Sequence, residues 1–300
     1  MAGLTVSRMD FGNFMEAIRK KAPRSALLAA ANHLEVTRFV LMRMEDGSPT
    51  KLTTPQIRSL LDFYCATETD RTEALRLWQE IREQDKAAKA QGNSKGFWKA
   101  YSDQVAPNFE KFLRLEGVAE EIVAYQPSIV PGLLQIPDYR RAIIRTDEPD
   151  LPAVDTERRL ALLRQRQLRL DDPTFRLECF LSEAVMRNRP CELSVMAAQL
   201  RWLAEVGERE NISIRAIPFS AGPHRGHTIQ IFTLLRLPKG QSGMVLPPVV
   251  YAEGLIGSVF HEQASEVDVY ERAITALRAV ALTEEDTRTL VSQSIKEYAP

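Results

Sequence analysis

Cysteine is scarce in this sequence, which holds only Cys65, Cys179 and Cys191 among its 300 residues. An odd and sparse set of this kind does not build a disulfide scaffold and is typical of a reducing compartment. No apolar run approaches the roughly 20 residues that a membrane-spanning helix needs. The first residues also lack the charged-then-apolar pattern of a secretion signal. We therefore expect a cytoplasmic protein that has no membrane partner.

Motifs of catalysis are also missing. The sequence has no phosphate-cradling glycine loop, no dinucleotide fingerprint and no serine elbow. Cys65 and Cys179 lie in apolar patterns and are expected to be small buried hydrophobes. His224 and His227 lie in a loop without the close Cys-x-x-Cys spacing of zinc sites, so a solvated turn is favoured over a metal site. We expect no catalytic residue, metal or cofactor, and an enzyme is the least favoured class.

The charge is distributed unevenly along the chain. The net charge is only −1, yet residues 1–60 contain nine Lys and Arg against five acids, a net +4 that leaves −5 on the other 240 residues. A basic end on a mildly acidic body is typical of a nucleic-acid-reading domain attached to a second domain. The length suffices for two domains, and 44% hydrophobic and 26% charged residues are ordinary for a globular protein.

The run from Ser25 to Gly47 predicts two short helices joined by a tight turn. The first helix has small residues on one face, at Ala26, Ala30 and Ala31. The second helix is expected over 38–45, with Thr37 as an N-cap whose hydroxyl accepts a backbone N–H. The residues 47–49, Gly-Ser-Pro, end it.

The apolar spacing predicts how this second helix is rotated. Leu41 and Met44, three residues apart, are expected to face inward, which leaves Phe39, Met42 and Arg43 on the outside. This is the outline of a helix-turn-helix, in which the second helix enters the major groove of DNA. Alanine-rich helix pairs also occur in ordinary helical bundles, so both interpretations stay open.

The rest of the chain divides into a helical part and a mixed part. Further N-terminal helices are expected over 11–21, 54–64 and 68–89, followed by a polar linker at 91–96. We therefore predict an all-helical, helix-turn-helix DNA-binding-like domain at 1–66, a connector helix and linker at 67–96, and an α+β regulatory or partner-binding domain at 97–300.

The C-terminal part interleaves helices with short strands. Helices are expected over 107–125, 137–146, 156–170, 193–206, 264–282 and 283–298, and strands over 175–181, 212–217, 229–237 and 249–253. This pattern predicts an α+β domain around a small, mostly antiparallel sheet.

Several runs resemble one family closely. They are Phe97–Asp103 (FWKAYSD), Tyr125–Gln135 (YQPSIVPGLLQ), Asp138-Tyr139, Ile217–Gly222 (IPFSAG) and Val249–Gly254 (VVYAEG). Together they resemble the actinobacterial regulators of the xenobiotic-response-element (XRE) type, whose C-terminal half is a domain of unknown function, sometimes labelled antitoxin-like. The resemblance covers about residues 11–290. It implies an N-terminal domain that binds double-stranded operator DNA, a homodimer, and often a small acidic partner protein encoded alongside.

The sequence differs from this family at positions of the helix pair that would contact DNA. The early glutamine of the first helix is replaced by Leu27, and polar residues of the second helix are replaced by Phe39, Val40 and Met42. Base edges are read mainly through hydrogen bonds, each good bidentate pair contributing about 1–3 kcal/mol of discrimination. The apolar residues motivate an alternative, a degenerate helix-turn-helix that acts as a protein-interaction module without sequence-specific DNA binding.

These patterns define two sets of candidate residues. The DNA-binding set comprises Arg24, Ser25, Thr37, Arg38, Phe39, Arg43 and Lys51. The set for a ligand or partner pocket comprises Trp98, Tyr101, His224, His227, Tyr251 and Glu253. Glu45 is expected to pair with Arg19 or Lys20, because a carboxylate repels phosphate. The favoured function is a dimeric DNA-binding transcription regulator with a C-terminal sensing or partner-binding domain.

Overall fold

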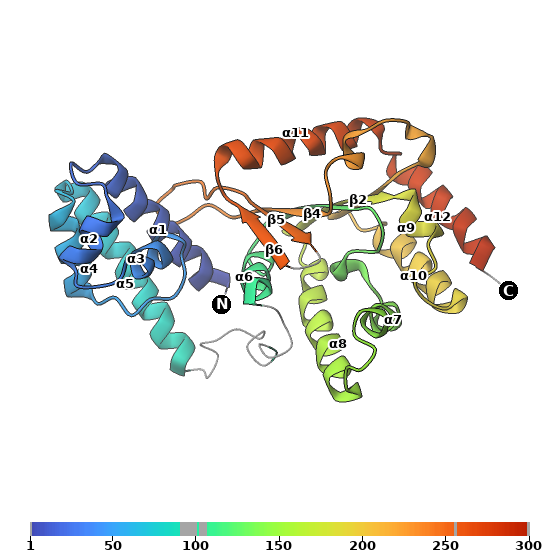
Figure 1. Ribbon diagram of the computed structural model, residues 1–300, viewed down its shortest axis with the longest axis horizontal. Helices are drawn as coiled ribbons and strands as arrows, with labels where there is room; N and C mark the ends of the chain where they lie inside the picture. The colour runs from blue at the N-terminus through green and yellow to red at the C-terminus, as the bar shows by residue number, and fades with distance from the viewer. Residues whose placement is uncertain (1, 91–100, 102–106, 255–256, 299–300) are drawn as a thin grey trace. The chain divides into compact units, whose positions relative to one another are not determined.

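The structure is a computed structural model that describes residues 2–90, 101, 107–254 and 257–298 (Figure 1). The chain forms two compact units, the first made of residues 1–96 and 237–246 and the second of residues 97–236 and 247–300. Each unit has a hydrophobic core built from its own residues. The first unit is discontinuous in the sequence, because it includes a segment that lies between two strands of the second.

The described N-terminal part of the first unit is helical. Its helices are α1 (Ala2–Lys21), α2 (Leu27–His33), α3 (Arg38–Glu45), α4 (Thr54–Phe63) and α5 (Glu68–Ala90). Helix α1 begins earlier than the expected residue 11, and α5 packs along it within the same unit. The rings of Phe11 and Trp78 lie 5.3 Å apart in this contact. The indole N–H of Trp78 donates to the Thr54 hydroxyl at 3.1 Å, so its burial leaves no donor unpaired.

A tight turn joins α2 to α3, as the sequence predicts. Ala30 and Ala31 are fully buried, and Glu35 in the turn adopts a left-handed φ of 54°. Thr37 has the extended backbone of an N-cap, but its side chain makes no capping hydrogen bond, so the expected role of its hydroxyl is wrong. Gly47 ends α3 with a φ of 68°. A Cβ atom there would lie 2.6 Å from the Met9 side chain, so only glycine fits.

The segment 237–246 is anchored on α1 within the first unit. The backbone N–H of Ser242 donates to one carboxylate oxygen of Asp10 at 2.7 Å, and its hydroxyl donates to the other. The Asp10 side chain is fully buried. A Cβ atom on Gly240 would lie 2.1 Å from the same carboxylate, so the backbone of the segment packs directly against this side chain of α1. These bonds satisfy a carboxylate that would otherwise be buried without partners.

The second unit is built on a six-stranded sheet. Its strands are β1 (Glu121–Gln126), β2 (Arg176–Ser182), β3 (Ile212–Ile217), β4 (Phe232–Arg236), β5 (Val249–Gly254) and β6 (Gly257–His261), in the order β3-β2-β1-β4-β5-β6. Strands β1, β2 and β3 pair in parallel, whereas β4, β5 and β6 continue the sheet antiparallel. The sheet is mixed, so the expected mostly antiparallel sheet is wrong. Helices connect β1 to β2 and β2 to β3, and such crossovers bring strands into parallel register.

The expected helix over 107–125 is also wrong in its second half. The helix ends at Glu116, Gly117 follows, and β1 begins at Glu121. Because β1 is a central strand buried on both faces, its apolar run shows no alternation that would distinguish it from a buried helix. The strand β6 and the short helix α9 (Glu183–Arg187) were not expected either.

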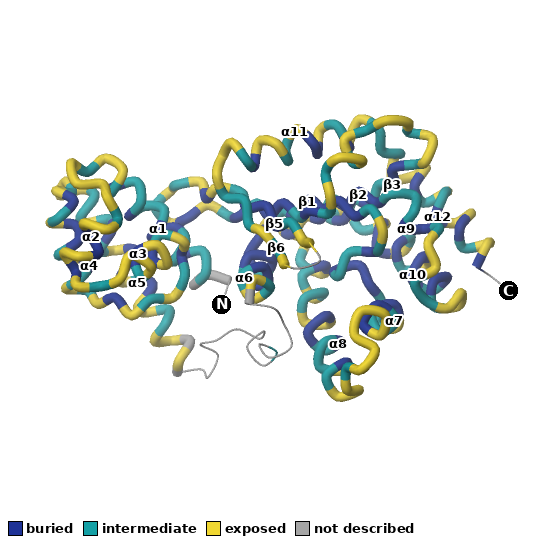
Figure 2. Tube along the Cα trace, viewed as in Figure 1, coloured by how far each residue is buried: buried dark blue, intermediate teal, exposed yellow. Residues whose placement is uncertain are grey.

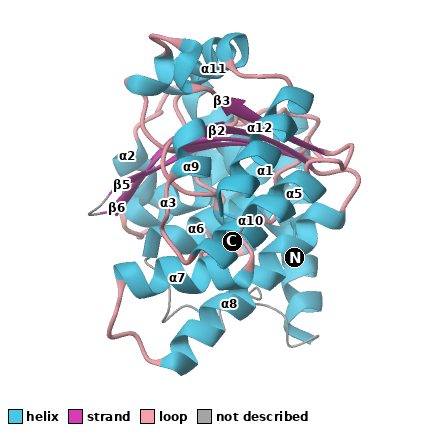
Figure 3. Cartoon of the chain, turned by 90° about the vertical axis from the view of Figure 1, so that its right-hand side faces the viewer, coloured by secondary structure: helices cyan, strands magenta, loops and turns pink. Residues whose placement is uncertain are grey.

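Helices cover both faces of the sheet (Figures 1 and 3). They are α6 (Pro107–Glu116), α7 (Pro137–Asp147), α8 (Ala153–Gln167), α10 (Leu193–Val206), α11 (Ala264–Val280) and α12 (Glu284–Tyr298). Val123 and Tyr125 of β1 belong to the core under Ile274 of α11. Because side chains alternate along a strand, Ile122 and Ala124 point to the opposite face, where α6, α7, α8 and α10 lie.

Burial follows this layered arrangement within the second unit. Figure 2 shows dark, buried positions along the sheet and exposed positions on the outer sides of the helices. In the part of the chain that the structure describes, no helix combines the length and the apolar character needed to cross a membrane.

Candidate functional site

The outer surface of α3 is the first candidate site. Leu41 and Met44 are 0% and 3% exposed, whereas Phe39 and Met42 are 63% and 40% exposed and Arg43 is exposed beside them. The predicted rotation of this helix is therefore confirmed. Two large apolar side chains and a cation face outward from an eight-residue helix.

An ion pair to α1 holds α3 in this orientation. The Arg19 guanidinium donates to both oxygens of Glu45, at 2.6 and 2.8 Å, which confirms the expected partner of Glu45. A Cβ atom on Gly12 would lie 2.3 Å from the Glu45 carbonyl oxygen, so the backbones of α1 and α3 meet where only glycine fits. The ion pair and the close approach together position the end of α3.

The remaining DNA-binding candidates are exposed as well. Arg24, Ser25, Thr37, Arg38 and Lys51 all reach the surface of the first unit. The Arg43 side chain lies over the Phe39 ring, 5.8 Å from its centroid, and donates to the carbonyl of Pro49 at 3.0 Å. This stacking orients the guanidinium without neutralising it, so its positive charge stays available to an anion.

A groove beside α4 and α5 adds positive charge to this unit. It has a volume of about 750 Å³, and its lining includes five basic and two acidic side chains, Lys51, Arg58, Arg82, Lys86 and Lys89 against Glu83 and Asp85. An excess of cations in a concave surface raises the local concentration of anionic partners. Lys51, a predicted phosphate contact, is part of this lining.

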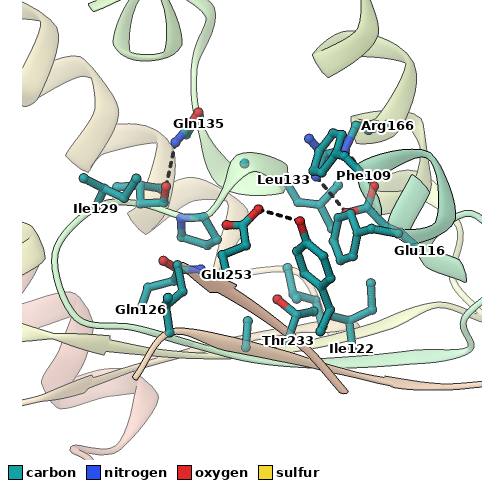
Figure 4. Close-up of a pocket in the computed structure, with 18 of the residues that line it drawn as sticks. Phe109, Glu116, Ile122, Gln126, Ile129, Leu133, Gln135, Arg166, Thr233 and Glu253 are labelled. Carbon is teal, nitrogen blue, oxygen red and sulfur yellow. Dashed lines mark hydrogen bonds and ion pairs between the residues drawn. The ribbon is translucent and has the colours of Figure 1, made fainter. Parts of the chain in front are cut away.

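The second candidate site is a cavity in the second unit, on the face of the sheet opposite α11 (Figure 4). Its volume is about 140 Å³. Strands β1, β2, β4 and β5 contribute residues on one side, and α6, α7, α8 and the segment 129–135 contribute residues on the other. The cavity therefore gathers side chains from elements that are distant in the sequence.

An ion pair buried at the cavity joins α8 to α6. Arg166 donates to both oxygens of Glu116 at 2.7 and 2.8 Å, and these side chains are 11% and 4% exposed. Burial lowers the pKa of Arg166, but the Glu116 carboxylate outweighs this effect and the net shift is upward. Gly132 makes room for the guanidinium, since a Cβ atom there would lie 3.2 Å from Nη1. Phe109 packs its ring 5.4 Å from the same guanidinium.

A second arginine at the cavity has no such partner. Arg140 of α7 lines the cavity and makes no side-chain hydrogen bond or ion pair with any residue in the described ranges. Burial lowers its pKa to about 10, and the positive charges of Arg166 and Arg159 act in the same direction. The carboxylates of Asp147 and Glu253 oppose this shift without touching the guanidinium.

Two glutamines that line the cavity carry buried hydrogen-bond acceptors. The side-chain oxygens of Gln126 and Gln135 are buried and have no partner among the described residues. The Gln135 side-chain amide nitrogen donates to the Val130 carbonyl at 2.7 Å, which fixes its orientation. Gln167 and Gln199 donate to the carbonyls of Gln135 and Leu134 at 2.7 and 2.8 Å, so this wall is held rigidly.

Two of the predicted pocket residues line this cavity. The Tyr251 hydroxyl donates to a Glu253 carboxylate oxygen at 2.9 Å, and both residues come from β5. Burial raises the pKa of Tyr251, so its hydroxyl remains a hydrogen-bond donor across the neutral range. Trp98 lies outside the described residues. Tyr101 does not reach the cavity lining and instead packs against a small cluster with Leu113.

The two histidines of the predicted pocket lie elsewhere. The rings of His224 and His227 are 4.1 Å apart, and burial together with the neighbouring ring lowers the pKa of His224. Their loop is joined to Tyr125, whose hydroxyl donates to the Gly226 carbonyl at 3.2 Å on the α11 side of the sheet. Side chains alternate between the two faces of a sheet, and Tyr251 points to the face opposite Tyr125. The expectation that the two histidines share a pocket with Tyr251 is therefore wrong.

The cysteines differ from expectation at one position. Cys179 is buried, and burial raises the pKa of its thiol. Cys65 is exposed, because it follows the end of α4 with a left-handed φ of 55° instead of continuing the apolar face of the helix. Within the described ranges, no three His, Cys, Asp or Glu residues are grouped so that they could hold a metal ion.

These features define the second unit as an α+β domain whose mixed sheet carries α11 on one face and a small polar cavity on the other. A family model described as a domain of unknown function, DUF5753, matches residues 109–293, and the chain belongs to this family. The match agrees with the C-terminal part of the resemblance found in the sequence. No curated protein and no solved structure matches the chain.

Proposed function

We propose that the protein is a DNA-binding transcription regulator of the helix-turn-helix class, of the XRE type, that acts as a dimer. The observation that supports this most directly is the rotation of α3, which buries Leu41 and Met44 and turns Arg38 and Arg43 outward. A recognition helix must present its outer face to the major groove while its inner face packs on the domain.

The surroundings of α3 support the same proposal. Arg24, Ser25 and Lys51 are exposed on segments that flank the helix pair, where side chains contact phosphates in this class of protein. The basic groove beside α4 and α5 adds charge that strengthens binding to DNA independently of its sequence. In this proposal the second unit acts as a sensing or partner-binding domain.

A second candidate function rests on the apolar residues of the same surface. Phe39 and Met42 are 63% and 40% exposed. Exposed apolar side chains that gather on one surface are typical of protein-protein contacts. In this alternative the helix pair binds a partner protein, and a small acidic partner would complement the neighbouring cations.

A titration at two salt concentrations separates these functions. The full chain is titrated against its own upstream DNA and against unrelated DNA. The test variant is R38Q/R43Q. The control variant is R145Q/R201Q, which changes two exposed arginines of the second unit. A regulator prefers its own DNA, and each lost phosphate contact reduces the slope of log K against log salt by about 0.9. If the protein binds both DNAs equally, and R38Q/R43Q shows the same slope of log K against log salt as the unmodified protein, the protein-binding function is favoured instead.

A further inference from the structure

We propose that the cavity on the α6–α8 side of the sheet binds a small organic carboxylate that also donates hydrogen bonds. The site is built from Arg140, Gln126 and Gln135, with Tyr251 and Glu253 at one side. This proposal concerns the second unit alone and does not depend on DNA binding by the first.

The unpaired guanidinium defines the charge of the ligand. Arg140 lines the cavity without a hydrogen bond or ion pair to any described residue, whereas the neighbouring Arg166 is fully engaged by Glu116. An arginine buried without a counter-ion is costly, and its planar fork matches a carboxylate in a bidentate arrangement. A carboxylate in the cavity would supply the missing partner.

The two glutamines define the second feature of the ligand. Their buried oxygens accept no hydrogen bond from the described protein, and such acceptors are costly to leave unsatisfied. Both residues belong to the lining of the cavity, so a hydroxyl or amide group on a ligand that reaches these side chains can donate to their oxygens. A ligand that offers only acceptors would leave both oxygens unpaired.

The size and walls of the cavity limit the body of the ligand. A volume of about 140 Å³ is close to that of a cavity known to hold benzene, about 150 Å³. Phe112, Ile122 and Leu177 supply apolar walls between the polar groups. The ligand is therefore a compact acid with a short apolar or ring-like body.

The charge balance favours a carboxylate over a phosphate. Among the described lining residues, Arg140 alone offers a cation without a partner, and the Glu253 carboxylate lines the same cavity. A second negative charge on the ligand would be repelled by Glu253 and would find no further unpaired cation among the described lining residues. A monoanion satisfies Arg140 without this repulsion.

The test uses 4-hydroxybenzoate as the probe and 4-hydroxybenzamide as its neutral counterpart. Binding to the full chain is followed by calorimetry and by ligand-observed magnetic resonance. We expect the acid to bind at least tenfold more tightly than the amide, and at least tenfold more weakly to R140M than to the unmodified protein. R145M removes an exposed arginine of the same helix and should leave binding unchanged.

The comparison of the two ligands needs no variant, so the test does not depend on the folding of R140M. Absence of binding by the acid at millimolar concentration would overturn the proposal. Equal affinity of the acid and the amide, or equal binding to R140M, would do the same. Displacement of the acid by an equal concentration of inorganic phosphate would overturn the assignment to a carboxylate.

Discussion

Arg19 of α1 and Glu45 at the end of α3 form a bidentate ion pair with N–O distances of 2.6 and 2.8 Å. Their side chains are only 12% and 8% exposed. A pair in this setting contributes little over two apolar groups, but removing one partner leaves the other charged and buried. The pair therefore fixes the orientation of α3 more than it adds to overall stability.

Replacing Arg19 by methionine should destabilise the first unit strongly. The Glu45 carboxylate would remain buried without its partner, at a cost of about 3–5 kcal/mol in the free energy of unfolding. Urea denaturation measures this loss. Lys20 is the matched control, because it is the next residue of α1, is 64% exposed and forms a surface ion pair with Glu16. K20M should lose less than about 1 kcal/mol, and equal losses in both variants would contradict the role of the buried pair.

Two alanine substitutions in α3 should differ sharply. Leu41 is fully buried, so L41A should cost about 2–5 kcal/mol through lost burial and the cavity that remains. Phe39 is 63% exposed, so F39A should stay within about 0.5 kcal/mol of the unmodified protein. Chemical denaturation of both variants checks the rotation of the helix. A large loss in F39A would mean that this ring packs in the core.

Replacing Arg140 by methionine should stabilise the ligand-free protein at neutral pH. The folded-state pKa of about 10 lies below the ordinary value of 12.5 because of burial and of the charges of Arg166 and Arg159, with Asp147 and Glu253 opposing. The unfolded chain therefore holds this proton more tightly, and at neutral pH the charged side chain costs about 1–3 kcal/mol on folding. R140M removes that cost.

The same shift predicts a pH dependence. Above pH 10 the folded protein releases the Arg140 proton while the unfolded chain still binds it, so the stability of the unmodified protein rises relative to R140M. The advantage of R140M should thus be full below about pH 9 and shrink above pH 10. Urea denaturation of both proteins at pH 7, 9 and 10.5 measures it. A constant difference across this range would contradict the assignment.

Adding a methyl group to Gly240 should destabilise the first unit. The new Cβ atom would lie 2.1 Å from the buried Asp10 carboxylate, so the segment 237–246 would have to shift and weaken its bonds to Asp10. We expect G240A to lose about 1–3 kcal/mol in thermal or chemical denaturation. At Gly254 a Cβ atom would meet its nearest neighbour at an ordinary 3.4 Å, so G254A serves as the control. Equal stability of the two variants would contradict the close packing at Asp10.

The sequence predicted local structure well where the chain alternates between buried and exposed positions. The bounds of α3 followed from Thr37 and from the Gly-Ser-Pro run at 47–49. Its rotation followed from Leu41 and Met44, because a surface helix must place its apolar residues on one side. The pairing of Glu45 with Arg19 or Lys20 was expected from charge, and the structure shows that Arg19 is the partner.

Structure that depends on partners distant in the sequence could not be predicted in this way. Strand β1 is buried on both faces, so its residues carry no period that distinguishes strand from helix. The cavity requires Gln126, Arg140 and Arg166 to converge from a strand and two helices. Each of them taken alone is an ordinary polar residue, and only the sheet order reveals that they share a space.

Because the first unit is discontinuous in the sequence, it cannot be moved into another protein as one continuous fragment. A fragment that stops at residue 96 would lack Ser242 and Gly240, leaving the Asp10 carboxylate without the groups that cover it. A chimeric protein that contains these helices must therefore also contain the segment 237–246, either as a separate peptide or fused in the same chain. The first unit includes residues 237–246, so it can be completed during translation only after most of the polypeptide has been synthesised.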